Sequence, residues 1–113
     1  MIVDYLPVDT ENIKKSPDLF SINLLGERLN FKISWNIVEN AFYFDLFHID
    51  GDIIVQGKRI VYGEDLLENI TNEKLPEALK ILVLDFTGEN QNVTYENFMG
   101  DVKPYIFTSD VNG

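Results

Sequence analysis

The sequence contains no cysteine and only one histidine, His48. Without cysteine the chain can form neither a disulfide bond nor a thiolate metal site. With a single histidine it cannot build a histidine-rich zinc site, and a Ser-His-Asp triad would have to use His48. These absences predict a protein without a metal or any other cofactor, and they give no indication of an enzyme.

Basic residues are also scarce, since nine lysines and arginines stand against nineteen aspartates and glutamates, for a net charge of −10. An acidic surface repels phosphate backbones and anionic lipids, so we expect neither nucleic acid nor membranes among the partners. The only adjacent basic pairs are Lys14-Lys15 and Lys58-Arg59, which are too few for a nucleic-acid site. The charge suits a soluble protein or one that docks against a basic protein partner.

No long apolar run opens the sequence, where 1–12 reads MIVDYLPVDTEN. We therefore expect no signal peptide, no membrane span and synthesis in a cytoplasm. A chain of 113 residues has the length of one domain with one modest core. We expect 1–17 to be an extended N-terminal arm with a short edge strand at 2–6, and 18–113 to be a single β domain.

Alternation of apolar and polar residues with a period of two runs through much of the remaining chain and predicts β-strands. The clearest case is 29–35, where Leu29, Phe31, Ile33 and Trp35 share one face. Further strands are expected at 20–25, 42–47, 53–57, 59–63, 78–86 and 102–108.

Four details complete the predicted fold. The run at 78–86 is apolar and long enough for a central strand, while Pro104 indicates a strand at a sheet edge or a proline at the strand's start. Residues 63–70 and 94–101 each fit a helical turn, the second capped by Thr94. The expected fold class is all-β: a small antiparallel β-barrel or sandwich with one or two short helical turns.

The segment HIDGD (48–52) lies between two expected strands and raises the question of a metal site. Asp50 and Gly51 form one of the pairs that most commonly supply the positive φ angles of a tight hairpin, so we predict a structural turn. A calcium loop would continue with oxygen ligands, whereas 53–55 reads Ile-Ile-Val. We expect no metal here, and we expect His48 to be a solvent-facing turn residue.

Aromatic residues are the remaining candidates for function. The periodicity assigns Trp35 to the core as an anchor, and Asn36 is expected to hold the following loop through its amide. Exposed aromatic side chains are enriched at protein interfaces. The candidates for partner contact are Tyr43, Phe47, Tyr62, Tyr105 and Phe107. No catalytic residue is expected, since the chain has no glycine-rich phosphate loop and no GxSxG turn.

The order of short landmarks along the chain resembles a known family. The landmarks are Leu6-Pro7, Trp35-Asn36, FYFDLF at 42–47, Asp50-Gly51, Ile53-Ile54, Gly57, Tyr62-Gly63 and Leu66-Leu67. Their order is similar to that of the small baseplate plug family of tailed bacteriophages and phage-tail-like particles, over about 5–107 and most closely over 29–67. The resemblance implies a structural protein of the virion tail, near the baseplate centre where tube, hub and spike meet, after assembly in the host cytoplasm.

Three functions remain open from the sequence. The first is the baseplate plug, which would act by occlusion and bracing through contacts with other tail proteins and would bind no small-molecule substrate. The second is a small acidic inhibitor or immunity-type protein that masks a basic partner. The third is a β-barrel hydrolase or sugar-binding module, which would need a functional pair of carboxylates, for example among Asp45, Asp50 and Asp52.

Overall fold

The computed structural model describes residues 2–73, 75 and 79–108, and within these residues it contains seven β-strands and no helix. The strands are β1 (Ile2–Tyr5), β2 (Asp18–Leu24), β3 (Glu27–Asn36), β4 (Ala41–His48), β5 (Ile53–Arg59), β6 (Lys80–Asp85) and β7 (Val102–Phe107). A three-stranded sheet has the order β1-β7-β6, and a four-stranded sheet has the order β2-β3-β4-β5. Every pairing of these strands is antiparallel.

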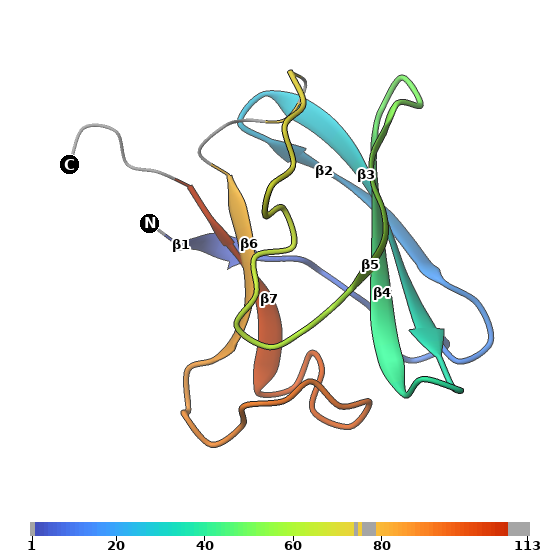
Figure 1. The fold of residues 1–113 in the computed structure, drawn as a ribbon, viewed down its shortest axis with the longest axis vertical. Coiled ribbons are helices and arrows are strands. Elements are labelled where there is room, and N and C mark those ends of the chain that lie inside the picture. The colour runs from blue at the N-terminus through green and yellow to red at the C-terminus, as the bar shows by residue number, and fades with distance from the viewer. Residues whose placement is uncertain (1, 74, 76–78, 109–113) are drawn as a thin grey trace.

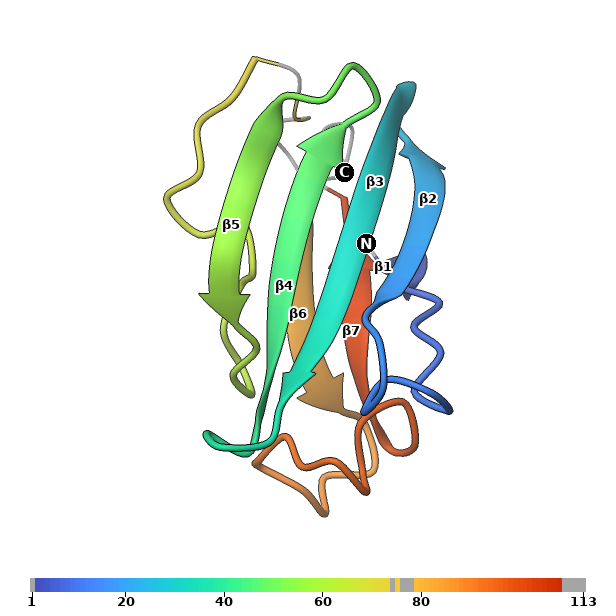
Figure 2. The same ribbon diagram turned by 90° about the vertical axis from the view of Figure 1, so that its right-hand side faces the viewer.

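The two sheets pack face to face as two layers (Figure 1). Where the four-stranded sheet faces the reader, β6 and β7 lie behind it and run in nearly the same direction as its strands (Figure 2). Within the described residues this is a sandwich of aligned sheets and not a closed barrel. The predicted all-β antiparallel fold is confirmed, and of its two possible architectures the sandwich is the one observed.

The core lies between the layers and follows the predicted alternation. On β3 the inward residues Leu29, Phe31 and Ile33 are buried, and the register places Phe31 beside Leu46 and Ile33 beside Phe44 on β4. The three-stranded sheet contributes the buried residues Ile81, Val83, Val102, Pro104 and Ile106. Because inward side chains come from every second position, the same strands must point their other side chains away from the core.

The segment after β1 also enters the core. Leu6, Val8 and Ile13 are buried among the apolar residues of the two sheets. β1 itself pairs only with β7 and is an edge strand, as predicted for 2–6. The sequence pattern does not reveal these three core residues, because the polar residues between them follow no strand or helix period.

β7 lies in the centre of its sheet, so the prediction that Pro104 marks a sheet edge or a strand start is wrong. Proline has no N–H and is normally excluded from a central strand. Here the Leu6 N–H donates to the Pro104 carbonyl at 2.9 Å. The Leu6 carbonyl, which an ordinary antiparallel partner would bond, accepts instead from the Val8 N–H at 2.9 Å. The chain turns after Leu6, so the donor that proline lacks is not needed.

β6 is an edge strand of its sheet, so the prediction of a central strand is wrong; Ala78, its expected first residue, lies outside the described residues. The outer edge of β6 is nevertheless covered. The Gly63 N–H donates to the Val83 carbonyl at 2.8 Å, and the Ile81 N–H donates to Asp65 Oδ1 at 3.0 Å. The preceding segment thus shields this edge. The strand is apolar because Ile81 and Val83 face the core while Leu82 and Leu84 occupy outward positions.

The predicted separate strand at 59–63 is wrong, because β5 continues without a break to Arg59. The β4–β5 register is irregular, and Gly57 within β5 has a φ of 67°. The Gly57 N–H donates to Asp45 Oδ1 at 2.6 Å instead of to the ladder. A bulge shifts the alternation of inward and outward residues by one position, so the sequence pattern predicts two short strands where the structure has one.

The two predicted helical turns are hydrogen-bonded turns and not helices. In the first, the Glu68 N–H donates to the Asp65 carbonyl at 3.1 Å. The second is capped by Thr94 as predicted, since its hydroxyl accepts from the Asn97 N–H at 3.1 Å. Asn97 Oδ1 accepts in return from the Thr94 N–H at 2.8 Å, which is the reciprocal pattern of a capping box without a following helix.

Candidate interaction surfaces

The HIDGD segment forms the turn between β4 and β5. The His48 N–H donates to the Asp52 carbonyl at 2.8 Å, and the Gly51 N–H donates to the His48 carbonyl at 2.9 Å. Gly51 has a φ of 100°, which glycine adopts without strain, and Asp50 Oδ1 accepts from the Asp52 N–H at 3.1 Å. In the described part of the chain, no three or more Asp, Glu or His side chains are grouped to hold a metal ion.

The prediction that His48 faces solvent is wrong, because its side chain is only 14% exposed. His48 Nε2 lies 2.8 Å from Glu27 Oε2, and Nδ1 lies 3.1 Å from Asp50 Oδ1. The hydrogen bond with Glu27 raises the pKa of His48, and Asp50 acts in the same direction while burial opposes both. The imidazole therefore ties the end of β4 to the start of β3.

Asn36 holds the tip of the β3–β4 hairpin. Its Oδ1 accepts from the N–H groups of Val38 and Glu39, both at 3.0 Å. Its Nδ2 donates to Glu39 Oε1 at 3.2 Å, and the Tyr43 hydroxyl donates to the same oxygen at 2.7 Å. This last hydrogen bond raises the pKa of Tyr43. The network fixes a tip whose Val38 side chain is 90% exposed.

Trp35 packs where this hairpin meets the rest of the molecule. Its ring centroid lies 4.7 Å from that of Phe42 and 5.2 Å from that of Tyr95, with an edge-to-face angle of 62° to Tyr95. Phe98 lies 4.5 Å from Phe42 and joins the same cluster. Trp35 Nε1 is buried, and the described residues offer it no hydrogen-bond acceptor. The cluster connects β3 and β4 to the loop between β6 and β7.

Asp85, at the end of β6, is a buried carboxylate that the sequence reading missed. It is 5% exposed and accepts four hydrogen bonds, from the N–H and hydroxyl of Thr87 and from the N–H and side-chain amide of Asn90, at 2.6–2.9 Å. The bond from the Thr87 hydroxyl is the largest cause that lowers the pKa of Asp85 to about 2, against the effect of burial. Asp85 shapes the loop after β6. The spacing Asp-x-Thr, typical of an Asx turn, was the available signal.

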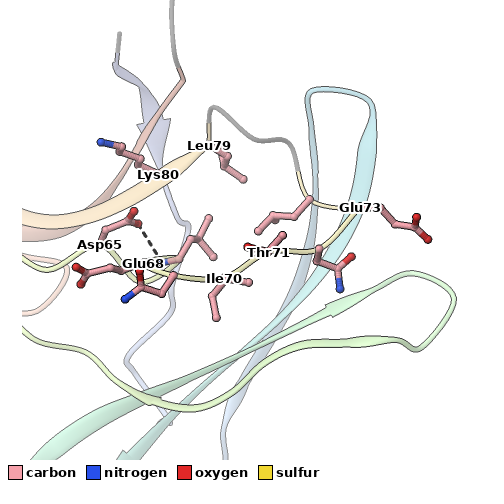
Figure 3. Close-up of a pocket in the computed structure, with 11 residues that line it drawn as sticks. Asp65, Glu68, Ile70, Thr71, Glu73, Leu79 and Lys80 are labelled. Atoms are coloured by element: carbon pink, nitrogen blue, oxygen red, sulfur yellow. Dashed lines mark hydrogen bonds between the residues drawn. The ribbon is translucent and has the colours of Figure 1, made fainter.

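A pocket of about 700 Å³ lies beside the outer edge of β6 (Figure 3). Asp65 lies on the wall of this pocket. Its Oδ1 accepts hydrogen bonds from the N–H groups of Leu67 and Ile81 at 3.0 Å each, so the carboxylate has a structural role. Glu68 and Glu73 lie at opposite ends of the pocket in Figure 3 and do not form an acid pair. Within the described residues, no helix is long and apolar enough to cross a membrane.

The five partner-contact candidates do not form one surface. Tyr62 packs against the core, and its hydroxyl accepts a backbone N–H from the end of β6 at 3.2 Å. Tyr43 and Phe47 point outward from β4, while Tyr105 and Phe107 point outward from β7. All four are half-buried. Four of the five candidates are therefore divided between the outward faces of the two sheets.

The outward face of the four-stranded sheet is mostly polar, and we call it the polar face. Across strands, Ser21 hydrogen-bonds to Asn30, and the register places Lys32 opposite Asp45. Its members on β2, β3 and β4 are Leu19, Ser21, Asn23, Arg28, Asn30, Lys32, Ser34, Tyr43, Asp45 and Phe47, and on β5 the 55% exposed Ile53 lies opposite Phe47. Most outward positions on β2, β3 and β4 are thus polar, as on the solvated face of an antiparallel sheet.

The outward face of the three-stranded sheet is apolar. We call it the aromatic face, and its members are Tyr5, Leu82, Leu84, Phe86, Tyr105 and Phe107. The Tyr105 ring lies 4.4 Å from that of Phe86 and 6.0 Å from that of Tyr5. The charged residues at outward positions of β6 and β7 are lysines only, Lys80 opposite Phe107 and Lys103 opposite Leu84.

Residues 3–109 match the protein-family model described as "Cyanophage baseplate Pam3 plug gp18". The chain belongs to this plug family. The match spans almost all of the chain, including both sheets and both outward faces. No curated protein matches the sequence.

Membership of the plug family confirms the resemblance drawn from the sequence landmarks. It makes the chain a structural protein of a phage baseplate, and baseplate proteins belong to the virion tail. A structural plug implies a role without catalysis. The family match gives no support to the acidic-inhibitor alternative.

Proposed function

We propose that the chain is a small plug seated at the centre of a phage or tail-like particle baseplate, where tube, hub and spike meet. It acts through protein–protein contacts with these proteins, after assembly in the cytoplasm of the bacterial host. The observation that carries this proposal is the plug-family match over residues 3–109. Catalysis, nucleic-acid binding, membrane binding and small-molecule substrates have no part in the proposed function.

A plug that occludes and braces a channel needs a body that keeps its shape. Two sheets around one core supply such a body, with overall extents of 38 × 33 × 22 Å. The hairpin tip is held by Asn36, the loop after β6 by Asp85, and the β4–β5 turn by His48. These three fixed connections support a mechanism of fitting and release as a rigid unit, without internal rearrangement.

The proposal is tested with particles from a producing culture. Tails are separated on a density gradient, and the fractions are probed for this protein and for the tube protein. We expect this protein to sediment with intact tails at a fixed ratio to the tube protein, and a strain deleted for its gene to yield defective tails. Free protein at the top of the gradient, with normal tails from the deletion strain, would refute the proposal.

A further inference from the structure

The aromatic face is an apolar surface of a kind that is not expected on a sandwich without a partner. An antiparallel sheet in a sandwich buries one face and solvates the other, so its outward positions are normally polar. On β6 and β7 the outward positions are instead Leu82, Leu84, Tyr105 and Phe107, between two lysines. In Figure 1 the four-stranded sheet lies on the other side of this sheet, against its inward face.

The aromatic face is already ordered before any partner arrives. Tyr105 packs against Phe86 and, edge to face, against Tyr5, and Lys103 Nζ lies 4.6 Å from the Tyr5 ring centroid. Phe86 is still 59% exposed at the end of β6. Side chains fixed in this way lose little conformational entropy on docking, which favours a tight contact.

The charges of the aromatic face indicate the chemistry of its occupant. The whole chain carries a net charge of −10, yet the charged groups at outward positions of β6 and β7 are Lys80 and Lys103 alone. A second copy of the chain that paired through the same face would bring lysines toward lysines. An apolar surface bordered by carboxylates would match both the rings and the two ammonium groups.

We propose that the aromatic face is the docking surface of the chain, and that its occupant is an apolar patch bordered by Asp or Glu side chains on another baseplate protein. The proposal rests on the proposed function, since it takes the partner from the baseplate. It adds which side of the plug is fixed and what chemistry fixes it. The polar face is left toward solvent.

The test is the occupancy of variants in purified tails, measured against the tube protein. The variant F86S/K80E/K103E changes the most exposed ring and both lysines, and its control L19S/K15E/R28E makes the same changes away from the aromatic face. Leu19 is 70% exposed, and Lys15 and Arg28 are exposed. Both proteins should keep the unfolding midpoint of the wild type. We expect the first to lose occupancy about tenfold or more and the control to stay within about twofold of the wild type.

Three outcomes would overturn the inference. If the face variant enters tails as well as the control does, the aromatic face is not the docking surface, although wild-type protein in the tails keeps the proposed function intact. Wild-type protein absent from tails would instead refute the proposed function itself. If the wild type, but not the face variant, sediments with vesicles of phosphatidylglycerol and phosphatidylcholine, the face is a lipid-binding surface.

A photo-crosslinking residue at position 86 identifies the occupant, with position 19 as the control. In purified tails we expect position 86 to crosslink to one other virion protein, at a peptide that contains apolar residues and at least one Asp or Glu. Crosslinks at position 86 to a second copy of this chain would overturn the assignment of the occupant. Equal crosslinking of both positions to the same protein would overturn the assignment of the face.

Discussion

The two outward faces of this sandwich rest on one core but carry opposite chemistry. On the polar face, Ser21 bonds to Asn30, and Lys32 stands opposite Asp45. On the aromatic face, rings and leucines occupy most of the outward positions, and Lys80 and Lys103, at the remaining ones on β6 and β7, have no carboxylate opposite them in the register. The four-stranded sheet thus has a mostly polar outward face and the three-stranded sheet an apolar one, and this difference is the basis for proposing that a partner covers the second.

The difference between the faces also indicates on which side a partner would bind the plug. A protein with two polar faces would offer no preferred docking side, whereas a protein with one polar and one apolar face can be bound and released through the apolar one. The apolar side includes the central strand β7 and both of its neighbours, so a docked partner would contact all three strands of the sheet. Four predictions separate the faces from the core that they share.

The largest expected effect is on the shared core. Phe44 is fully buried, and its ring lies 6.0 Å from that of Phe31. Phe44→Ala should lower the free energy of unfolding by about 3–5 kcal/mol, because it leaves a cavity between the sheets. Urea denaturation measures this. Phe47→Ala, on the same strand but on the polar face, should cost only about 1 kcal/mol, since the ring is half-buried. Equal losses would mean that β4 is not oriented as described.

A smaller effect is expected at the hairpin tip next to the polar face. Asn36→Ala removes the acceptor for the Val38 and Glu39 N–H groups and should cost about 1 kcal/mol of unfolding free energy. The matched control Asn23→Ala, on the exposed outward side of β2, should stay within about 0.5 kcal/mol of the wild type. Amide hydrogen exchange should quicken at the tip in Asn36→Ala alone. Unchanged exchange there would contradict the role of Asn36.

Acid should weaken the sheet of the aromatic face through Asp85. The pKa of Asp85 is lowered from 3.8 to about 2 in the folded protein, so its stabilising contribution is complete above pH 3.8 and is lost as the pH falls through about 2. The unfolding midpoint of the wild type should therefore drop over this range. Asp85→Asn should be less stable at neutral pH and should respond less to acid. Parallel pH curves for the two proteins would exclude Asp85 as a cause.

Mild alkali should affect the sheet of the polar face through His48, with the smallest effect of the four. The pKa of His48 is raised above 6.5, so its contribution is complete below pH 6.5 and is lost as the pH rises through the raised value. An NMR titration of the imidazole should report a pKa above 6.5 in the wild type and a lower one in Glu27→Gln. The same pKa in both proteins would remove Glu27 as the cause.

Much of the fold could be predicted because strand alternation is a local signal. The strands around 29–35 and 42–47 were predicted from their period of two, and they form β3 and β4. The turn at Asp50-Gly51 and the cap at Thr94 were predicted from short-range hydrogen-bonding chemistry. These features depend on residues within a few positions of one another, which is why a single sequence reveals them.

The errors involve partners far away along the chain. Pro104 is tolerated in a central strand because of Leu6, which lies about a hundred residues earlier. His48 is held by Glu27, 21 residues away, so a local pattern could only suggest a turn residue. The aromatic face could not be predicted from the sequence, because it depends on the register of β6 on β7, which brings Leu82 beside Tyr105. The five partner-contact candidates from the sequence remain predictions, and the structure brings only Tyr105 and Phe107 onto this face.

The most direct test of the difference between the faces is hydroxyl-radical footprinting of the free protein and of purified tails that contain it. The measurement compares the oxidation rate of each labelled side chain in the two states. We predict strong protection in tails of Phe86 and Tyr105, on the aromatic face, and little change at Leu19 and Phe47, on the polar face. Protection of the polar face with continued labelling of Phe86 and Tyr105 would contradict the account.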